Sequence, residues 1–112
     1  MLRPQEILAL TMIFRNKNIL GITVKELIDQ AISSNYDDTG VGFYSTVELK
    51  TPLKKIPDIK MWEYNFNHPK FSYGGSFMCT IINESQLELE AVAFGGDNWP
   101  TKIDPSQFEE LT

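Results

Sequence analysis

The sequence holds one histidine, His68, and one cysteine, Cys79, and a Cys–His pair can form a nucleophile with its base. Cys79 lies within the apolar run Phe77–Ile82, where a buried cysteine acts as a small apolar residue without thiolate character. His68 stands between Asn67 and Pro69, a setting typical of a turn. We therefore expect the thiol to be inert and the pair to carry no catalysis.

Other sequence signatures of chemistry are missing. A zinc site needs three or four Cys, His or carboxylate ligands at regular spacing, and the sequence contains no such set. Ser45 and Ser76 lack the Gly-x-Ser-x-Gly context of a nucleophile elbow, and residues 95–97 lack the glycine pattern that binds phosphate. We expect a non-enzymatic protein with no catalytic residue, no metal and no cofactor.

Four glutamates are candidates for a binding surface. Glu88 and Glu90 alternate with leucines and therefore share one face of an expected strand, while Glu48 and Glu63 lie on the polar faces of two others. If those faces are neighbours, the glutamates form an acidic stripe that suits a cationic partner. A solvated polar face explains the same pattern, and both interpretations stay open from the residues alone.

Loop residues supply the remaining candidates. Asp37, Asp38 and Asp97 lie in turn-forming segments, where Asp could contribute a carboxylate to a metal or an acid–base pair but far more often hydrogen-bonds the local backbone. Trp99 follows two glycines and precedes a proline. Its ring either plugs the end of the sheet or anchors a partner, as aromatic residues do in interface hot spots.

Composition narrows the class of protein. The 112 residues carry 15 acidic and 10 basic side chains, a net charge of −5, which disfavours nucleic acid because phosphate neutralisation needs clustered Lys and Arg. No apolar run approaches the ~20 residues that span a bilayer, and residues 1–6 interrupt any signal peptide with an acid and a proline. With its single cysteine, we expect one cytosolic domain, residues 1–112, that binds neither membrane nor nucleic acid.

The strands that must position these residues centre on an expected β-hairpin. Its two apolar runs, Phe77–Ile82 and Leu87–Phe94, are separated by a polar tetrapeptide. Two earlier strands are expected at Val41–Leu49 and Met61–Phe66. The segment Lys50–Lys60 between them contains two prolines and is predicted to be a loop.

Helices are predicted before and after the strands in the sequence. An apolar stripe at helical spacing begins at Pro4 and ends at a polar break at residues 15–18. Thr23 and Glu26 match a capping box, in which the glutamate reaches back to the Thr23 N–H, and this second helix is expected to run to Ser33 or Ser34. Asp104 precedes Pro105 and predicts a short helix ending near residue 111.

Consecutive strands joined by short links usually pair as neighbours. We therefore predict an α+β fold: a four-stranded antiparallel meander with two N-terminal helices packed on one face and a short C-terminal helix.

Four sequence blocks also suggest a family: GFYSTVEL (residues 42–49), NHP (67–69), GGSFMC (74–79) and LELEAVAFGGDNWP (87–100). Together they resemble a pattern in small bacterial immunity-type proteins that accompany secreted toxins in contact-dependent growth inhibition and related systems. The shared residues are mainly Gly, Pro and aromatics, so the resemblance carries over no catalytic residue. It implies a small cytosolic protein that neutralises its cognate toxin by occluding it.

If that toxin is a basic nuclease, exposed acids should attract it and one or two aromatics should anchor it. The expected partner-binding residues are Asp37, Asp38, Tyr44, Glu48, Glu63, Glu88, Glu90, Asp97 and Trp99. Two other classes remain open from sequence: a small hydrolase or ligand-binding protein with a pocket near His68, Asp97 and Trp99, and a structural subunit that pairs through an edge strand. The oligomeric state stays open as well.

Overall fold

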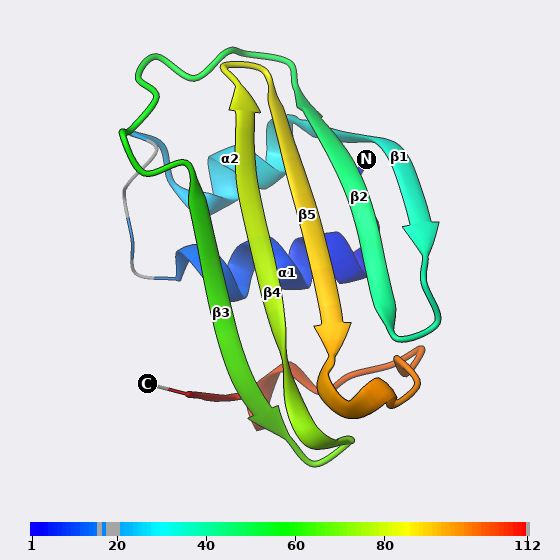
Figure 1. The fold of residues 1–112 in the computed structure, drawn as a ribbon. Helices are drawn as coiled ribbons and strands as arrows, with labels where there is room; N and C mark the ends of the chain where they lie inside the picture. Colours follow the sequence, from blue (N-terminus) through cyan, green and yellow to red (C-terminus); the bar gives the residue numbers. More distant parts are fainter. Residues whose placement is uncertain (16, 18–20, 112) are drawn as a thin grey trace.

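Residues 1–15, 17 and 21–111 are described by the computed structural model, and they form a body of 39 × 28 × 22 Å (Figure 1). The α+β class agrees with the sequence prediction. The element order is α1 (Pro4–Phe14), α2 (Val24–Gln30), β1 (Ala31–Asp38), β2 (Gly42–Leu49), β3 (Met61–His68), β4 (Phe71–Asn83), β5 (Gln86–Ala93), the 3-10 helices η1 (Phe94–Gly96) and η2 (Pro105–Gln107), and β6 (Glu109–Glu110).

The predicted four-stranded meander is wrong, because the described strands form one six-stranded antiparallel sheet in the order β1-β2-β5-β4-β3-β6. The expected hairpin, β4 and β5, does lie at its centre. The link between β2 and β3 passes over the end of this hairpin, where the Leu53 N–H donates to the Glu84 carbonyl at 2.7 Å and the Leu53 side chain is buried. This long link delivers β3 to the far side of β4, so β2 and β3 are not neighbours.

The second helix is shorter than predicted, because its expected last residues belong instead to strand β1. α2 ends at Gln30, three or four residues short of the predicted end at Ser33 or Ser34, and the backbone at Ala31 is already extended. The following Ser-Ser-Asn stretch consists of residues that compete with helical hydrogen bonds, and β2 offers an edge with which residues 31–38 pair. Tertiary pairing therefore overrides an apolar spacing, at Ile28 and Ile32, that also fits a helix.

The predicted C-terminal helix is also wrong. The Asp104 carboxylate does accept from the Ser106 N–H, at 2.9 Å, and Pro105 does occupy the first helical position. The turn nevertheless lasts only three residues. The chain then becomes extended as β6, which pairs with β3 at Phe66 and Asn67.

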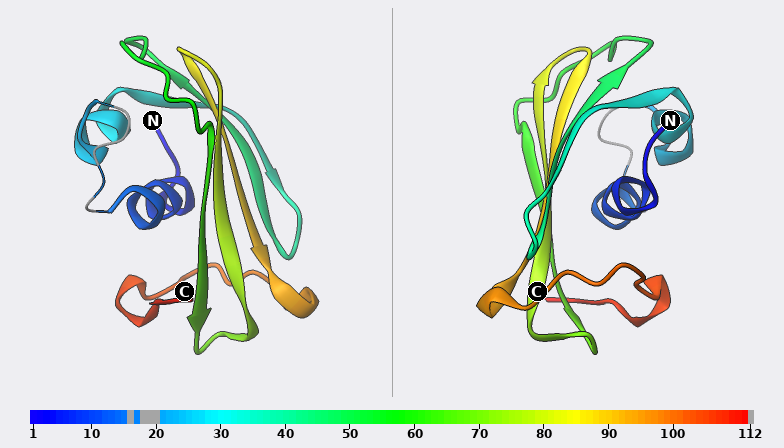
Figure 2. Two further views of the ribbon diagram at one scale, coloured as in Figure 1. Left: turned by 60° about the vertical axis from the view of Figure 1, so that its left-hand side comes forward. Right: turned by 90° about the vertical axis from the view of Figure 1, so that its right-hand side faces the viewer.

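Both helices lie on the same side of the sheet, together with the C-terminal segment, and α1 crosses the strands (Figures 1 and 2). The core lies between these layers and includes the alternate residues Phe77, Cys79, Leu87 and Leu89 of the central hairpin. α1 ends at Phe14. The remainder of the predicted break at residues 15–18 falls partly on Asn16 and Asn18, which lie outside the described residues.

The predicted cap of α2 is present with one change. The Thr23 hydroxyl oxygen accepts from the Glu26 N–H at 3.1 Å, as expected for an N-cap. The Glu26 carboxylate, however, accepts from the Thr23 hydroxyl at 3.1 Å and not, as was predicted, from the Thr23 N–H.

Candidate functional site

One face of the sheet has no described segment packed on it except η1, which contacts β4 at one end, since the helices and the rest of the C-terminal segment lie on the other side (Figure 2). We call this surface the open face. Strand alternation places on it every second residue of β1 to β5, while the residues between them enter the core. Its members include Asp37, Tyr44, Thr46, Glu48, Met61, Glu63, Met78, Thr80, Ile82, Glu88, Glu90 and Val92.

Strand register aligns five of these residues in a line across the sheet. Asp37 pairs with Tyr44, Tyr44 with Glu90, Glu90 with Met78, and Met78 with Glu63. Directly opposite residues of an antiparallel pair project to the same face and contact each other. We call this line the acid–apolar row, because acidic residues on β1, β5 and β3 alternate with Tyr44 on β2 and Met78 on β4.

The open face carries charge of one sign. All ten Lys and Arg residues of the chain lie outside the six described strands. By contrast, Asp37, Glu48, Glu63 and Glu90 on this face are exposed, and Glu88 is half-buried. Among the described residues, none of these acids forms a salt bridge with Lys or Arg, and clustered carboxylates without bases on the same strands produce a negative field that attracts a cationic surface.

At the centre of the open face, Tyr44 is held in place by Glu88. The phenol O–H donates to the Glu88 carboxylate. This hydrogen bond, partial burial and the negative charges of Glu88 and Glu90 together raise the pKa of Tyr44 above its ordinary value. Beside the ring lies a shallow hollow of about 70 Å³, whose lining includes Met61, Met78 and Glu90. An apolar floor edged by carboxylates therefore marks the middle of the face.

Six of the nine predicted partner-binding residues lie on the open face: Asp37, Tyr44, Glu48, Glu63, Glu88 and Glu90. Sequence reasoning missed Met61, Met78 and Thr80, which line the hollow between them. A signal was present, because Met78 alternates with Phe77 and Cys79 and so had to point away from the core. Strand order, which the sequence did not reveal, was needed to bring Met78 between Glu63 and Glu90.

The other three predicted residues lie elsewhere. The Asp38 carboxylate accepts from the Gly40 N–H at 2.8 Å, and the Asp97 carboxylate accepts from the Ser72 N–H at 2.7 Å, so both serve local backbone. Trp99 packs against the rings of Phe43, Phe66, Phe71 and Phe77 at centroid distances of 5.0–6.4 Å. The Trp99 ring therefore plugs the end of the sheet, one of the two roles considered from sequence.

His68 is buried and both ring nitrogens are occupied. Nδ1 accepts from the Lys70 N–H at 3.2 Å, and Nε2 lies 3.0 Å from the Asp104 carbonyl oxygen. An acceptor at Nδ1 and a carbonyl facing Nε2 correspond to the neutral tautomer protonated at Nε2. The ring thus ties the β3–β4 turn to the C-terminal segment and offers no free lone pair for use as a base.

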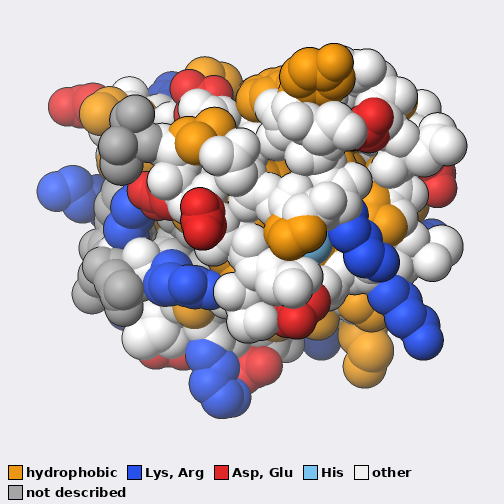
Figure 3. All heavy atoms as spheres, turned by 90° about the horizontal axis from the view of Figure 1, so that it is seen from below, with side chains coloured by type: hydrophobic (Ala, Val, Ile, Leu, Met, Phe, Trp, Pro, Cys, Tyr) orange, Lys and Arg blue, Asp and Glu red, His pale blue; other side chains and the backbone are white. Residues whose placement is uncertain are grey.

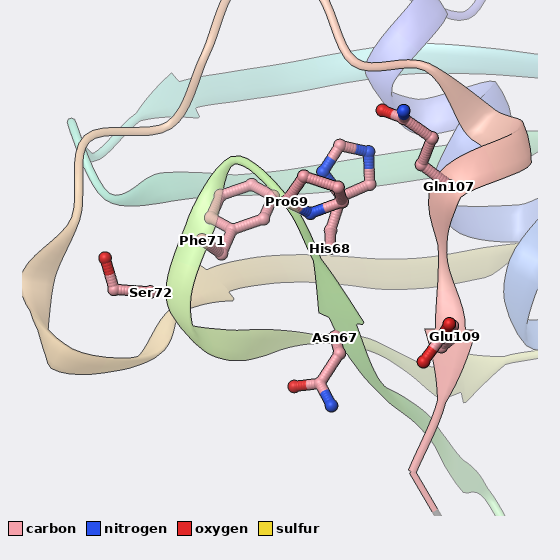
Figure 4. Close-up of a pocket in the computed structure, with 7 residues that line it drawn as sticks. All are labelled: Asn67, His68, Pro69, Phe71, Ser72, Gln107 and Glu109. Atoms are coloured by element: carbon pink, nitrogen blue, oxygen red, sulfur yellow. The ribbon is translucent and has the colours of Figure 1, made fainter.

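A hollow of about 500 Å³ lies beside His68, lined by Asn67, Pro69, Phe71, Ser72, Gln107 and Glu109. Its polar side chains do not converge on one point, and those of Asn67, Ser72 and Glu109 turn away from the imidazole (Figure 4). Asp97 and Trp99 are not part of its lining; Trp99 lines a separate hollow with Asp38. Seen from this end of the molecule, acidic and basic side chains are intermingled (Figure 3).

Cys79 and His68 cannot act together. Cys79 pairs with Trp62 and His68 pairs with Phe71, so six residues of β3, about 20 Å at the rise of a strand, separate them. Cys79 is fully buried, and loss of hydration raises the pKa of its thiol to about 12. The thiol therefore stays protonated at neutral pH.

One buried polar pair remains, Ser45 and Glu6. The Ser45 hydroxyl donates to the Glu6 carboxylate, which also accepts from the Arg3 N–H at 2.8 Å, and both side chains are fully buried. These contacts close the first turn of α1 onto β2. Because neither group reaches solvent, the pair fits a structural link rather than a nucleophile.

Residues 1–15, 17 and 21–111 contain no cluster of His, Cys, Asp or Glu suited to a metal ion, and none of their helices could span a membrane.

At the edges of the sheet, β1 carries a bulge between Ser33 and Asn35, and β6 covers part of β3. Bulges and covered edges discourage edge-to-edge association.

No protein-family model, curated protein or solved structure matches this chain.

Proposed function

We propose that this chain is a non-enzymatic binding protein whose open face docks onto a cationic partner protein. One observation carries the proposal: the open face exposes several acids around Tyr44 and Met78, while every Lys and Arg lies outside the strands. Apolar contacts supply affinity at the centre of an interface, and complementary charge supplies attraction and orientation.

The sign of the charge selects among partner classes. A second copy of the chain would bring two acidic faces together. Like charges placed opposite each other in an interface weaken binding by roughly several kcal/mol. Nucleic acids and anionic membrane surfaces carry the same sign as the open face and are disfavoured for the same reason. A protein surface rich in Lys and Arg is the remaining complement.

We further propose that this partner is a cognate toxin, with nuclease activity, that the chain neutralises in the bacterial cytosol. Two points support this step: the resemblance of residues 42–100 to immunity-type proteins, and the charge of the open face. A nuclease needs a cationic surface to bind phosphates, and a flat acidic face is suited to covering such a surface. The proposed action is occlusion and requires no chemical step and no cofactor.

Growth protection tests this function. The proposal predicts that an adjacent gene encodes a secreted toxin, and the probe is the C-terminal domain of that protein, expressed in the cytosol of a bacterial host together with the present chain. The wild-type chain should restore growth, and the double variant Glu88→Lys, Glu90→Lys should not. The matched control is Asp58→Lys, Glu110→Lys, which makes the same charge change at two exposed acids outside the open face, in the β2–β3 link and opposite buried Phe66, and should still protect.

Failure of the wild-type chain to restore growth would reject the immunity function. Loss of protection by both double variants would show that net charge, rather than the open face, is what matters. Circular dichroism of each variant must match that of the wild type, so that loss of protection is not loss of the fold.

A further inference from the structure

We propose that the open face receives a helix of the partner, lying across the strands with Lys or Arg residues at positions i, i+7 and i+14 and apolar residues between them. The inference rests on the proposed function, because it assumes that the occupant is cationic. It adds the secondary structure, the direction and the residue pattern of the segment that docks.

The spacing of the acid–apolar row supplies the first argument. Its acids Asp37, Glu90 and Glu63 lie on β1, β5 and β3, which are two strands apart at each step. Neighbouring strands are about 4.8 Å apart, so successive acids are separated by roughly 9–10 Å. Residues seven apart on an α-helix are separated by about 10.5 Å and lie on nearly the same side of it.

The apolar members of the row fit the same pattern. Tyr44 and Met78 lie one strand from the acids on either side, which is about 4.8 Å. Helix positions i+3 and i+4 lie about 4.5–6 Å along the axis from position i. A helix whose face alternates basic and apolar side chains therefore places each base near an acid and each apolar residue over Tyr44 or Met78.

An extended strand fits less well. Side chains on one face of an extended strand repeat every ~6.7 Å, whereas neighbouring residues of the row are about 4.8 Å apart. A strand laid across the row is therefore out of register with it after two side chains. The row from Asp37 to Glu63 spans four strand steps, about 19 Å, and a fifteen-residue helical stretch spans about 21 Å. Because the mismatch stays small over the whole row, the helix is the better occupant.

The sheet already accepts a helix in this orientation on its other face. α1 crosses the strands and contacts β3, β4 and β5 (Figure 1). The twist of this sheet is therefore compatible with a crossing helix. The hollow at Tyr44 and Met78 provides a depression for the apolar side chains of a helix on the open face.

Binding of designed peptides tests the inference. The aligned peptide has about 18 residues, enough for appreciable helix, with lysines at i, i+7 and i+14 and leucines at i+3 and i+10. The scrambled peptide has the same composition and helix propensity, but its lysines are distributed around the helix. Fluorescence anisotropy at low salt should give a dissociation constant about tenfold lower for the aligned peptide.

Variants locate the contact. Glu90→Gln removes the central acid of the row and should weaken the aligned peptide about two- to fivefold, the effect of one exposed charge pair. Glu110→Gln makes the same chemical change on β6, opposite buried Phe66, and should leave binding unchanged. The far-ultraviolet spectrum of the bound aligned peptide should show helix.

Three outcomes overturn the inference. Equal affinity for the aligned and scrambled peptides would reject the helical register but leave a cationic occupant in place. Binding of the aligned peptide without helix formation would reject the secondary structure. Absence of binding by either peptide would reject the helix inference, whereas growth protection by the wild-type chain separately decides the proposed function.

Discussion

Tyr44 and Glu88 connect the chemistry of single side chains to the proposed surface. The Tyr44 O–H donates to the Glu88 carboxylate, so the ring lies against its neighbours instead of rotating in solvent. A fixed aromatic side chain loses little conformational freedom on binding, so little binding free energy is lost in ordering it. The sequence predicts both as partner-binding residues but not this diagonal contact, because the strand register places Tyr44 directly opposite Glu90.

The first prediction concerns the ionisation of Tyr44. Its pKa is raised from the ordinary 10.0 mainly by the Glu88 hydrogen bond, so Glu88→Ala should lower it toward that value. Because the pKa is higher in the folded chain, the associated stabilisation is present below about pH 10 and is lost as pH rises through the folded value. Ultraviolet titration, with Tyr44→Phe subtracted to isolate this residue, measures the shift; identical pKa values with and without Glu88 would contradict the contact.

The second prediction is that Cys79 does not react in the folded protein. Burial raises its thiol pKa to about 12 and removes access to reagents. Mass spectrometry after treatment with iodoacetamide should show no adduct on the native chain and complete labelling in denaturant. Rapid native labelling would mean that β4 is not a packed central strand.

At the scale of elements, period-two alternation was the most informative pattern in the sequence. It located β4 and β5 and assigned their faces correctly, because a strand buried on one side alternates strictly. Short polar elements were harder. Residues 31–38 carry no strong pattern of either period, and their strand forms because β2 offers a pairing edge.

The third prediction tests the β-hairpin at the centre of the sheet. Leu89 is fully buried on β5, so Leu89→Ala should lower the free energy of unfolding by about 2–5 kcal/mol. The control, Ile82→Ala, truncates an exposed residue of β4 and should change stability by no more than about 0.5 kcal/mol. Urea denaturation measures both, and equal effects would remove the hairpin from the core.

The fourth prediction tests the start of α2. The Thr23 hydroxyl oxygen accepts from the Glu26 N–H, so Thr23→Ala should cost about 0.5–2 kcal/mol of stability. Thr23→Ser keeps the acceptor and serves as the matched control. Unchanged stability in Thr23→Ala, together with rapid hydrogen exchange at Glu26 in the wild type, would place the start of the helix elsewhere.

At the scale of the whole molecule, strand order decides which candidate residues meet. Glu48 lies on β2 and Glu63 on β3, the next strand in the sequence. A meander would have placed these two strands side by side. In the actual order, β5 and β4 separate them, and Met78 comes to lie between Glu63 and Glu90. Local patterns cannot reveal this order, because it depends on the path of the link at residues 50–60 over the central hairpin.

The same order explains why the open face has one sign of charge. Five strands without Lys or Arg lie side by side, so their outward acids form one continuous surface. Basic residues are confined to helices, loops and turns at the periphery. Composition alone showed an excess of five acids, and the fold concentrates exposed acids on the open face.

The most direct test of docking by the open face is the association rate with the proposed partner toxin domain, measured by surface plasmon resonance at low and high salt. Charges separated by more than ~10 Å are largely screened at 0.1 M ionic strength, so the wild-type rate should fall as salt rises. The variant Glu88→Lys, Glu90→Lys should associate more slowly at low salt, while Asp58→Lys, Glu110→Lys should associate like the wild type. A rate that is independent of salt and equal in all three proteins would contradict the claim that the open face docks onto a cationic partner.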